Sequence, residues 1–304
     1  MFVVLYRKWF YLVSAVLVAV SVASMGMWGL QYGIDFAGGS LIELEYATAR
    51  PTVEVVQKQI ATTNIGAFSA RESGDKGFIL RTKHLTQEQH DAVISVLSKD
   101  ATGKATGVDE KRFDSVGPLL GQEAARKAIV SITLVILAIV LFITYAFRQV
   151  SEPVSSWKYG LIAIIALVHD IIIPAGAFAI LGHFHGFEVD TLFITALLVI
   201  LGFSIHDTIV VFDRVRENLK NRSSGEQFEH IVGKSISQTF VRSINTSMTV
   251  LISLVIMYFV GSEATKHFVV ALLVGITAGT YSSIFLGSPL LVTFQKLQEK
   301  KGKK

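Results

Sequence analysis

Two carboxylates lie inside apolar runs long enough to cross a membrane, and they are the residues of this sequence best placed for chemistry. Asp170 falls within the run 159–181 and Asp207 within the run 192–212. A charged side chain at the centre of a lipid-spanning helix costs about 2.5 to 3.5 kcal/mol on insertion scales, so such residues usually face a bundle interior, a partner or a water path. We therefore expect each carboxylate either to exchange a proton or to anchor its helix to a neighbour.

Asp207 has two charged or titratable neighbours in the predicted arrangement. His206 precedes it, and Arg242 lies at the entry to a later apolar run, where its long side chain can snorkel. A low dielectric favours the neutral form of an aspartate, whereas a nearby arginine favours the ionised form. This opposition predicts that Asp207 accepts a proton and that its state follows the position of Arg242. A static salt bridge or hydrogen bond is the alternative for Asp207, and for Asp170 the static alternative weighs more heavily.

The antiparallel order of the two runs places these carboxylates at similar depths, so a shared polar interior is expected. The pairs His169–Asp170 and His206–Asp207 also offer metal-binding atoms, which makes an intramembrane metalloenzyme an alternative. Adjacent residues on a helix diverge by about 100°, so His169 and Asp170 are not expected to point inward together. The zinc-protease pattern His-Glu-x-x-His is absent from the sequence. We expect no enzyme activity, no metal and no cofactor.

The composition is that of a membrane protein, with 51% hydrophobic and 17% charged residues. Six apolar runs are long enough to cross a hydrocarbon core of about 30 Å. They cover residues 10–30, 128–147, 159–181, 192–212, 244–260 and 268–291. The first run exceeds the roughly 7 to 15 apolar residues of a cleaved signal peptide, so an uncleaved signal-anchor is expected. Cysteine is absent, which excludes disulfides and thiolate sites within the chain.

The domain organisation follows from these runs and from the charges between them. We expect a first transmembrane helix at 1–30, an extracytoplasmic domain at 31–127, a five-helix membrane region at 128–294 with a cytoplasmic loop at 213–243, and a basic cytoplasmic tail at 295–304. Lysine and arginine concentrate before the first run, in the loop 213–243 and in the tail, so both termini are predicted to be cytoplasmic. Segment 31–127 has nearly balanced charge, which argues against a nucleic-acid-binding face.

Segment 31–127 also has the pattern of a small folded domain. Strands are predicted at 41–46, 67–71, 78–83 and 112–116, and amphipathic helices at 52–63 and 87–98. The order β-α-β-β-α-β predicts an α+β ferredoxin-like fold. The glycines that precede the first strand, Gly38 and Gly39, are a candidate hinge because glycine has wide backbone freedom. A simple tight turn is the alternative.

Four segments resemble the SecD/SecF family of bacterial protein-export membrane proteins, within the resistance-nodulation-division superfamily. They are GIDFAGG at 33–39, VHD at 168–170, GFSIHDTIVVFDRVREN at 202–218 and RSINTS at 242–247. The first segment is shared by both branches of the family, whereas six spans and one outer domain favour the SecF branch. One departure is His206, which stands where the family more often has asparagine and adds a titratable group beside Asp207.

The resemblance implies a resistance-nodulation-division type bundle of six transmembrane α-helices in the bacterial cytoplasmic (inner) membrane. It also implies pairing with SecD, association with the SecYEG translocon, and proton-driven assistance to a translocating polypeptide; YajC, YidC and membrane lipids are further candidate partners. It places proton coupling at Asp207 and Arg242, and we add Asp170 and His206 to the same candidate site. Two alternatives are a passive scaffold subunit and half of a proton-coupled exporter of small molecules or lipids.

Overall fold

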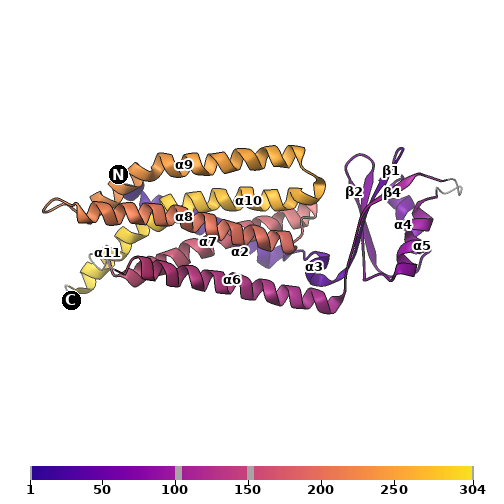
Figure 1. The fold of residues 1–304 in the computed structure, drawn as a ribbon, viewed down its shortest axis with the longest axis horizontal. Helices are drawn as coiled ribbons and strands as arrows, with labels where there is room; N and C mark the ends of the chain where they lie inside the picture. Colours follow the sequence, from indigo (N-terminus) through magenta and orange to yellow (C-terminus); the bar gives the residue numbers. More distant parts are fainter. Residues whose placement is uncertain (1, 100–104, 149–153, 303–304) are drawn as a thin grey trace. The chain divides into compact units, whose positions relative to one another are not determined.

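The computed structural model describes residues 2–99, 105–148 and 154–302 of the chain. It forms two compact units, a helical unit of Met1–Gln31 and Val130–Lys304 and an α+β unit of Tyr32–Ile129. The expected domain 31–127 corresponds to the α+β unit, with its ends shifted by one and two residues. Figure 1 shows the elements of both units along the chain.

The helical unit is built almost entirely from long helices. Its elements are α1 (Phe2–Leu5), α2 (Arg7–Trp28), the latter part of α6 (Pro118–Ala146), α7 (Ser156–His185), α8 (Thr191–Lys220), α9 (Phe228–Val260), α10 (Glu263–Tyr281), the π-helical segment η1 (Ser282–Gly287) and α11 (Ser288–Gly302). Within the described residues, six helical stretches are long and apolar enough to span a membrane, which confirms the expected number. The stretches in α7, α8 and α10–α11 are the most enclosed, and those in α2, α6 and α9 the least.

Several helices continue well beyond the apolar runs that predicted them. The expected loop 213–243 is largely helical, because α8 ends at Lys220 and α9 begins at Phe228. Likewise, the expected tail from 295 continues α11 to Gly302; residues 303 and 304 lie outside the described residues. Apolar length reports how much of a helix can cross the bilayer. Lysine, arginine, glutamate and glutamine are good helix formers, so the polar ends remain helical.

Two enclosed helices have an irregular backbone near their centres. Pro174 lies inside α7 and has no amide hydrogen to donate to the carbonyl of Asp170, four residues earlier. Between α10 and α11 the backbone is π-helical over η1, and Pro289 follows at the second position of α11. Such π-helical turns often mark functional sites.

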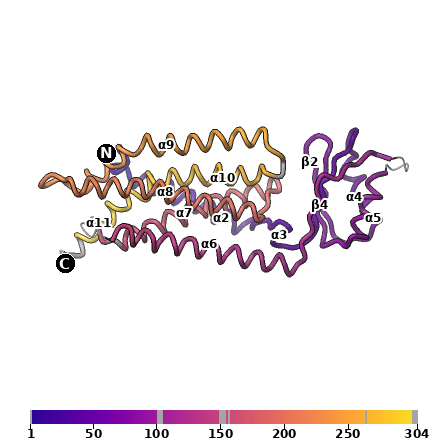
Figure 2. The backbone as a smooth tube through the Cα atoms, viewed as in Figure 1, coloured from indigo at the N-terminus to yellow at the C-terminus, as the bar shows by residue number. Residues whose placement is uncertain are grey.

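The α+β unit confirms the predicted order of strands and helices. Its elements are α3 (Ile34–Ala37), β1 (Gly39–Tyr46), α4 (Val53–Ala61), β2 (Phe68–Ser73), β3 (Gly77–Thr82), α5 (Gln87–Leu97) and β4 (Val108–Val116). The four strands form an antiparallel sheet in the order β2-β3-β1-β4, the arrangement of a ferredoxin-like split βαβ unit. Helices α4 and α5 cover one face of the sheet (Figure 2).

The core of the α+β unit follows from the alternation of the central strands. Ile42 and Leu44 of β1 and Leu80 of β3 are fully buried, and they pack with Val56 of α4 and Val93 of α5. Alternating buried and partly exposed residues on β1 place Leu41, Glu43 and Glu45 on its second face. A capping box, in which Thr86 and Gln89 exchange hydrogen bonds, begins α5.

Gly38 and Gly39 form a tight approach of backbone segments at the start of β1. Both have positive φ, 74° and 133°. A Cβ atom at Gly38 would lie 2.9 Å from the Cα of Pro118, and one at Gly39 would lie 2.6 Å from the carbonyl oxygen of Thr82. The two positions therefore require glycine for close packing as well as for backbone conformation. Whether they also act as a hinge stays a prediction.

Candidate proton site

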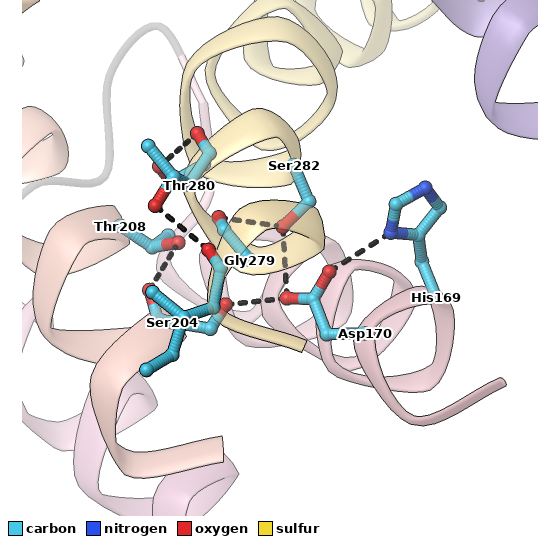
Figure 3. Close-up of polar contacts among 9 residues, drawn as sticks. His169, Asp170, Ser204, Thr208, Gly279, Thr280 and Ser282 are labelled. Atoms are coloured by element: carbon cyan, nitrogen blue, oxygen red, sulfur yellow. Dashed lines mark hydrogen bonds and ion pairs between the residues drawn. The ribbon is translucent and has the colours of Figure 1, made fainter. Parts of the chain in front are cut away.

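Asp170 is the centre of a buried polar network between three helices (Figure 3). Its Oδ2 accepts hydrogen bonds from the hydroxyl of Ser204 on α8 and, at 2.8 Å, from the hydroxyl of Ser282 in η1. Its Oδ1 lies 2.8 Å from Nδ1 of His169. Both carboxylate oxygens thus have partners, and the carboxylate connects α7, α8 and the π-helical segment.

Two glycines on α10 let α8 pack closely, so that Ser204 can donate its hydrogen bond to Asp170. A Cβ atom at Gly275 would lie 2.1 Å from the side chain of Ile200, and one at Gly279 would lie 2.9 Å from the Cβ of Ser204. The GxxxG spacing of Gly275 and Gly279 therefore lets α8 and α10 approach closely. The carbonyl of Gly279 also accepts from the Ser282 hydroxyl, at 3.1 Å. The glycines position the hydroxyls that hold Asp170.

The structure corrects the expectation that His169 and Asp170 cannot both point inward. His169 is 3% exposed, and its ring stacks on Tyr281 of α10 with centroids 6.2 Å apart. Although the Cβ vectors of neighbouring residues diverge, the imidazole is long enough to return its Nδ1 to the carboxylate. The helical angle alone underestimates the reach of a histidine ring.

Asp207 lies on α8, one turn beyond Ser204, and is 3% exposed. Its neighbours are the charge-bearing His206 beside it on α8, the hydroxyl of Ser243 on α9 and, with the weakest effect, Arg242 on α9. Among the described residues, neither Oδ2 of Asp207 nor the hydroxyl oxygen of Ser243 has a hydrogen-bond partner, although both atoms are buried. Oδ2 of Asp207 is thus a buried oxygen without a hydrogen-bond partner in the described chain, and the pairing of Asp207 with Arg242, which lies in the middle part of α9, stays a prediction.

Arg242 and His206 lie on the exposed face of their helices. Among the described residues, no hydrogen bond joins Asp207 to Asp170; the hydroxyl of Ser204, on the same helix as Asp207, is bonded to Asp170. The four predicted residues are therefore arranged as an enclosed Asp170, an enclosed Asp207 at the α8–α9 contact, and exposed His206 and Arg242.

No individual role was predicted for the buried hydroxyls. Ser204, Ser282 and Ser243 are 1% exposed or less, and Ser247 and Thr280 bond to each other across α9 and α10 at 2.6 Å. Repeated serine and threonine within apolar runs was the available signal, because a hydroxyl in a membrane helix can satisfy a carboxylate on a neighbouring helix.

The metal-binding alternative concerns clusters of histidine and carboxylate side chains. Within the described part of the chain, no three histidine, aspartate or glutamate side chains converge in an arrangement that could hold an ion. The arrangement consists instead of buried carboxylates with hydroxyl and imidazole donors, which is suited to holding and transferring protons.

Comparison with known proteins relates this fold to protein export. The C-terminal SecD/SecF protein-export membrane protein family matches residues 97–297, and the SecD/SecF GG motif matches residues 24–49. The protein translocase subunit SecF of Thermobaculum terrenum is 41% identical, over 96% of this chain and 93% of the relative. The SecF subunit of Synechocystis is 34% identical, over 96% of this chain and 93% of that relative.

A crystal structure of SecDF from Thermus thermophilus, described as a translocon-associated membrane protein, has the same fold. The TM-score is 0.80 at 28% identity, and the match covers 96% of this chain and 38% of the longer SecDF chain. The match supports the resistance-nodulation-division type fold and places this chain against one part of the SecDF protein. The chain therefore belongs to the SecD/SecF family of protein-export membrane proteins, in its SecF branch of protein translocase subunits.

Proposed function

We propose that this chain works with SecD to use the proton-motive force for polypeptide translocation, with Asp207 as the proton-responsive residue. One contrast carries the proposal: both oxygens of Asp170 have hydrogen-bond partners, whereas the buried Oδ2 of Asp207 has none among the described residues. A proton that binds Asp207 displaces no existing bond to that oxygen. Asp170 is the static anchor of the bundle.

Arg242 supplies the electrostatic bias in this mechanism. When Arg242 approaches Asp207 the ionised carboxylate is favoured, and when it withdraws the buried carboxylate is favoured in its neutral form. The arginine lies at the exposed edge of α9, where its side chain has room to move. Moving one charge through about 100 mV supplies about 2.3 kcal/mol, enough to shift a helix pair between two nearly equal packings.

SecD is proposed to cover an exposed polar face on α8 and α9. On α9 the exposed residues Arg242, Asn245, Thr246 and Thr249 fall on one face at about 100° per residue. On α8 the exposed His206 lies on one face with Gly202 and Thr195. Polar residues on a membrane helix usually face protein or water instead of lipid, so this face fits a membrane partner.

The proposed function also includes a membrane, an orientation and further partners for the chain. The chain lies in the bacterial inner membrane with both termini cytoplasmic, supported by the basic residues at the expected cytoplasmic ends. The α+β unit is then extracytoplasmic and is the part that meets the translocating polypeptide. The SecYEG translocon, with YajC and YidC, is the proposed larger assembly. We propose no enzyme activity for the chain.

Proton-dependent export by variants tests the mechanism. In inverted vesicles that contain SecYEG and SecD, Asp207→Asn should abolish the stimulation of preprotein translocation by the proton gradient. Arg242→Lys keeps the positive charge but loses the planar guanidinium group, so it should only partly reduce the stimulation of translocation by the proton gradient. Co-purification of each variant with SecD is the control. If Asp207→Asn lost both its co-purification with SecD and its export activity, the scaffold alternative would be supported instead.

The SecD contact has its own test, because the chain has no cysteine and single cysteines can be introduced cleanly. Thr249→Cys lies on the polar face of α9, whereas Val255→Cys lies on its exposed apolar face. A bifunctional reagent should cross-link the first variant to SecD and leave the second unlinked. Equal cross-linking of both would place SecD elsewhere.

A further inference from the structure

The motif 202–218 continues past Asp207 to Asn218, which joins the last part of α8 to α9. The side-chain amide of Asn218 donates two hydrogen bonds to α9. One reaches the hydroxyl oxygen of Ser235 at 2.8 Å, and the other reaches Oε1 of Gln238 at 2.9 Å. Because an amide NH₂ group has two hydrogens, both donor positions of Asn218 are used. We call this contact the Asn218 clasp.

The acceptors of the clasp have fixed positions on α9. Ser235 is fully buried, and its hydroxyl donates to the carbonyl oxygen of Ile231 at 2.8 Å. That hydroxyl has one hydrogen, so its oxygen meets Asn218 as an acceptor. Ser235 and Gln238 are three residues apart, about one helical turn, so the Asn218 amide spans a single turn of α9. The clasp therefore specifies which turn of α9 lies beside the end of α8.

The clasp and the candidate proton site lie along the same seam between α8 and α9, which a short turn joins in antiparallel order (Figure 1). Ser235, Thr239 and Ser243 recur every four residues on α9, and each is 5% exposed or less. Residues four apart follow one ridge of a helix, so these hydroxyls form one packed row. The row begins at the Asn218 clasp and reaches Ser243, a neighbour of Asp207, about 12 Å further along α9.

Apolar side chains fill the seam between these two polar contacts. Val211 and Val215 of α8 belong to one buried hydrophobic cluster with Val232 and Ile236 of α9. The burial of apolar surface is non-directional, whereas a hydrogen bond requires a defined distance and angle. The clasp thus adds a directional constraint to the register of the two helices.

A separate set of contacts attaches the start of α9 to other helices of the bundle. Glu229 is paired with Arg7 of α2, at 2.5 Å, and with Lys296 of α11. Because these ion pairs do not involve α8, they remain when the clasp is removed. We therefore expect a variant without the clasp to fold, with α9 less constrained against α8.

We propose that Asn218 is a positioning residue, whose clasp fixes the register of α9 on α8 and so keeps Ser243 and Arg242 close to Asp207. Asn218 is 11 residues from Asp207 along α8 and acts through the position of α9. A slip of one turn would carry Arg242 about 5.4 Å along the helix axis. The consequence for export rests on the proposed role of Asp207, whereas the register can be measured by itself.

Spin-label distances in the full chain with SecD test the register directly, because the chain has no native cysteine. One label is placed at Lys220→Cys on α8 and the other at Met248→Cys on α9, both at exposed positions. Asn218→Leu keeps the side-chain size but removes both donors, so the distance distribution should shift or broaden by about 5 Å, one helical turn. Asn221→Leu, at the exposed residue that follows α8, is the matched control and should leave the distribution unchanged. An unchanged distribution in Asn218→Leu would overturn the proposal.

Preprotein translocation with and without a proton gradient tests the effect on the proton site. In inverted vesicles that contain SecYEG and SecD, Asn218→Leu should lose most of the stimulation by the gradient and keep the translocation measured without it. Equal losses under both conditions would show a purely structural residue and would overturn the positioning role, as would a shifted distance with full stimulation. If Asp207→Asn itself kept full stimulation, the proposed function would fail, and the distance measurement would still decide the register.

Discussion

At the scale of single residues, the two membrane aspartates differ in what their oxygens contact. Asp170 accepts from two hydroxyls and meets an imidazole, whereas Asp207 keeps a buried oxygen without a partner in the described chain. An aspartate held by several donors on different helices stabilises their packing. An aspartate with an unoccupied oxygen can change its protonation with little rearrangement of its neighbours.

This difference predicts that the two asparagine variants fail in different ways. Asp170→Asn replaces an acceptor oxygen with an NH₂ group that faces donors, so it should cost about 1 to 3 kcal/mol of stability. Asp207→Asn leaves existing bonds in place and should unfold close to the unaltered chain. Thermal unfolding in detergent micelles measures both. A smaller loss for Asp170→Asn than for Asp207→Asn would contradict the anchor role.

Tyr46 gives the α+β unit a predicted dependence on alkaline pH. Burial raises the pKa of the Tyr46 phenol to about 12, and its hydroxyl has no partner among the described residues. In the unfolded chain a tyrosine titrates near pH 10, so the folded state holds the proton more tightly and stability falls as pH rises from 10 to 12. The loss should reach about 2 kcal/mol at pH 12.

Urea unfolding of the full chain, followed by the circular dichroism of its aromatic residues, measures this loss. Tyr46→Phe removes the titrating group and keeps the ring against Phe78, whose centroid is 6.1 Å away. The variant should therefore lose less stability than the unaltered chain over the same pH interval. Equal losses would show that other groups cause the alkaline dependence.

Part of the site could be predicted from residues alone. Asp207 was expected to be sheltered within an apolar run, and the structure buries it; Arg242 is close enough to act on Asp207 electrostatically, and their functional pairing stays a prediction. The partners of Asp170 could not be assigned, because serines occur throughout membrane helices and only packing selects Ser204 and Ser282. The prediction that His169 does not point inward with Asp170 was wrong. The angle between neighbouring Cβ atoms was considered, whereas the imidazole ring is long enough to turn back to the carboxylate.

At the scale of elements, the contact between α8 and α10 depends on Gly279. Gly279→Ala would place a Cβ atom 2.9 Å from the Cβ of Ser204, which has no flexible end to move aside. The helices must then separate, and overpacking of this kind costs about 1 to 3 kcal/mol. The matched control is Gly202→Ala on α8, where an added Cβ meets no atom within 4 Å.

Two measurements check this prediction: the thermal unfolding temperature, and the ¹⁵N resonance of His169, which is bonded to Asp170. Gly279→Ala should lower the melting temperature and shift the ¹⁵N resonance of His169, because Ser204 moves away from the carboxylate. Gly202→Ala should leave both nearly unchanged. Identical behaviour of the two variants would show that the close approach of α8 and α10 does not hold the network.

Element boundaries show what periodicity can and cannot predict. The strands and helices of residues 39–116 follow from alternation and helical spacing, and their order gave the correct fold. Helix ends in the helical unit extend past the apolar runs because polar residues also favour helix. The π-helical turn at Ser282–Gly287 was not predicted, because it lies within an apolar run whose spacing does not distinguish it from an α-helix.

At the scale of the whole molecule, the distribution of basic residues predicts the side on which each part lies. In cells, Asp75→Cys in the β2–β3 turn should react with a membrane-impermeant thiol reagent, whereas Asn221→Cys between α8 and α9 should not. The absence of native cysteine makes each label unambiguous. The reverse pattern would overturn the proposed orientation.

In the proposed mechanism Asp207 changes its protonation state during translocation and Asp170 does not. Infrared difference spectra of the full chain with SecD, recorded as the pH on one side of the membrane is lowered, distinguish the two carboxyl groups. We predict a protonated-carboxyl band that disappears in Asp207→Asn and persists in Asp170→Asn. A band that persists in Asp207→Asn and disappears in Asp170→Asn would show that Asp170 is the group that takes the proton.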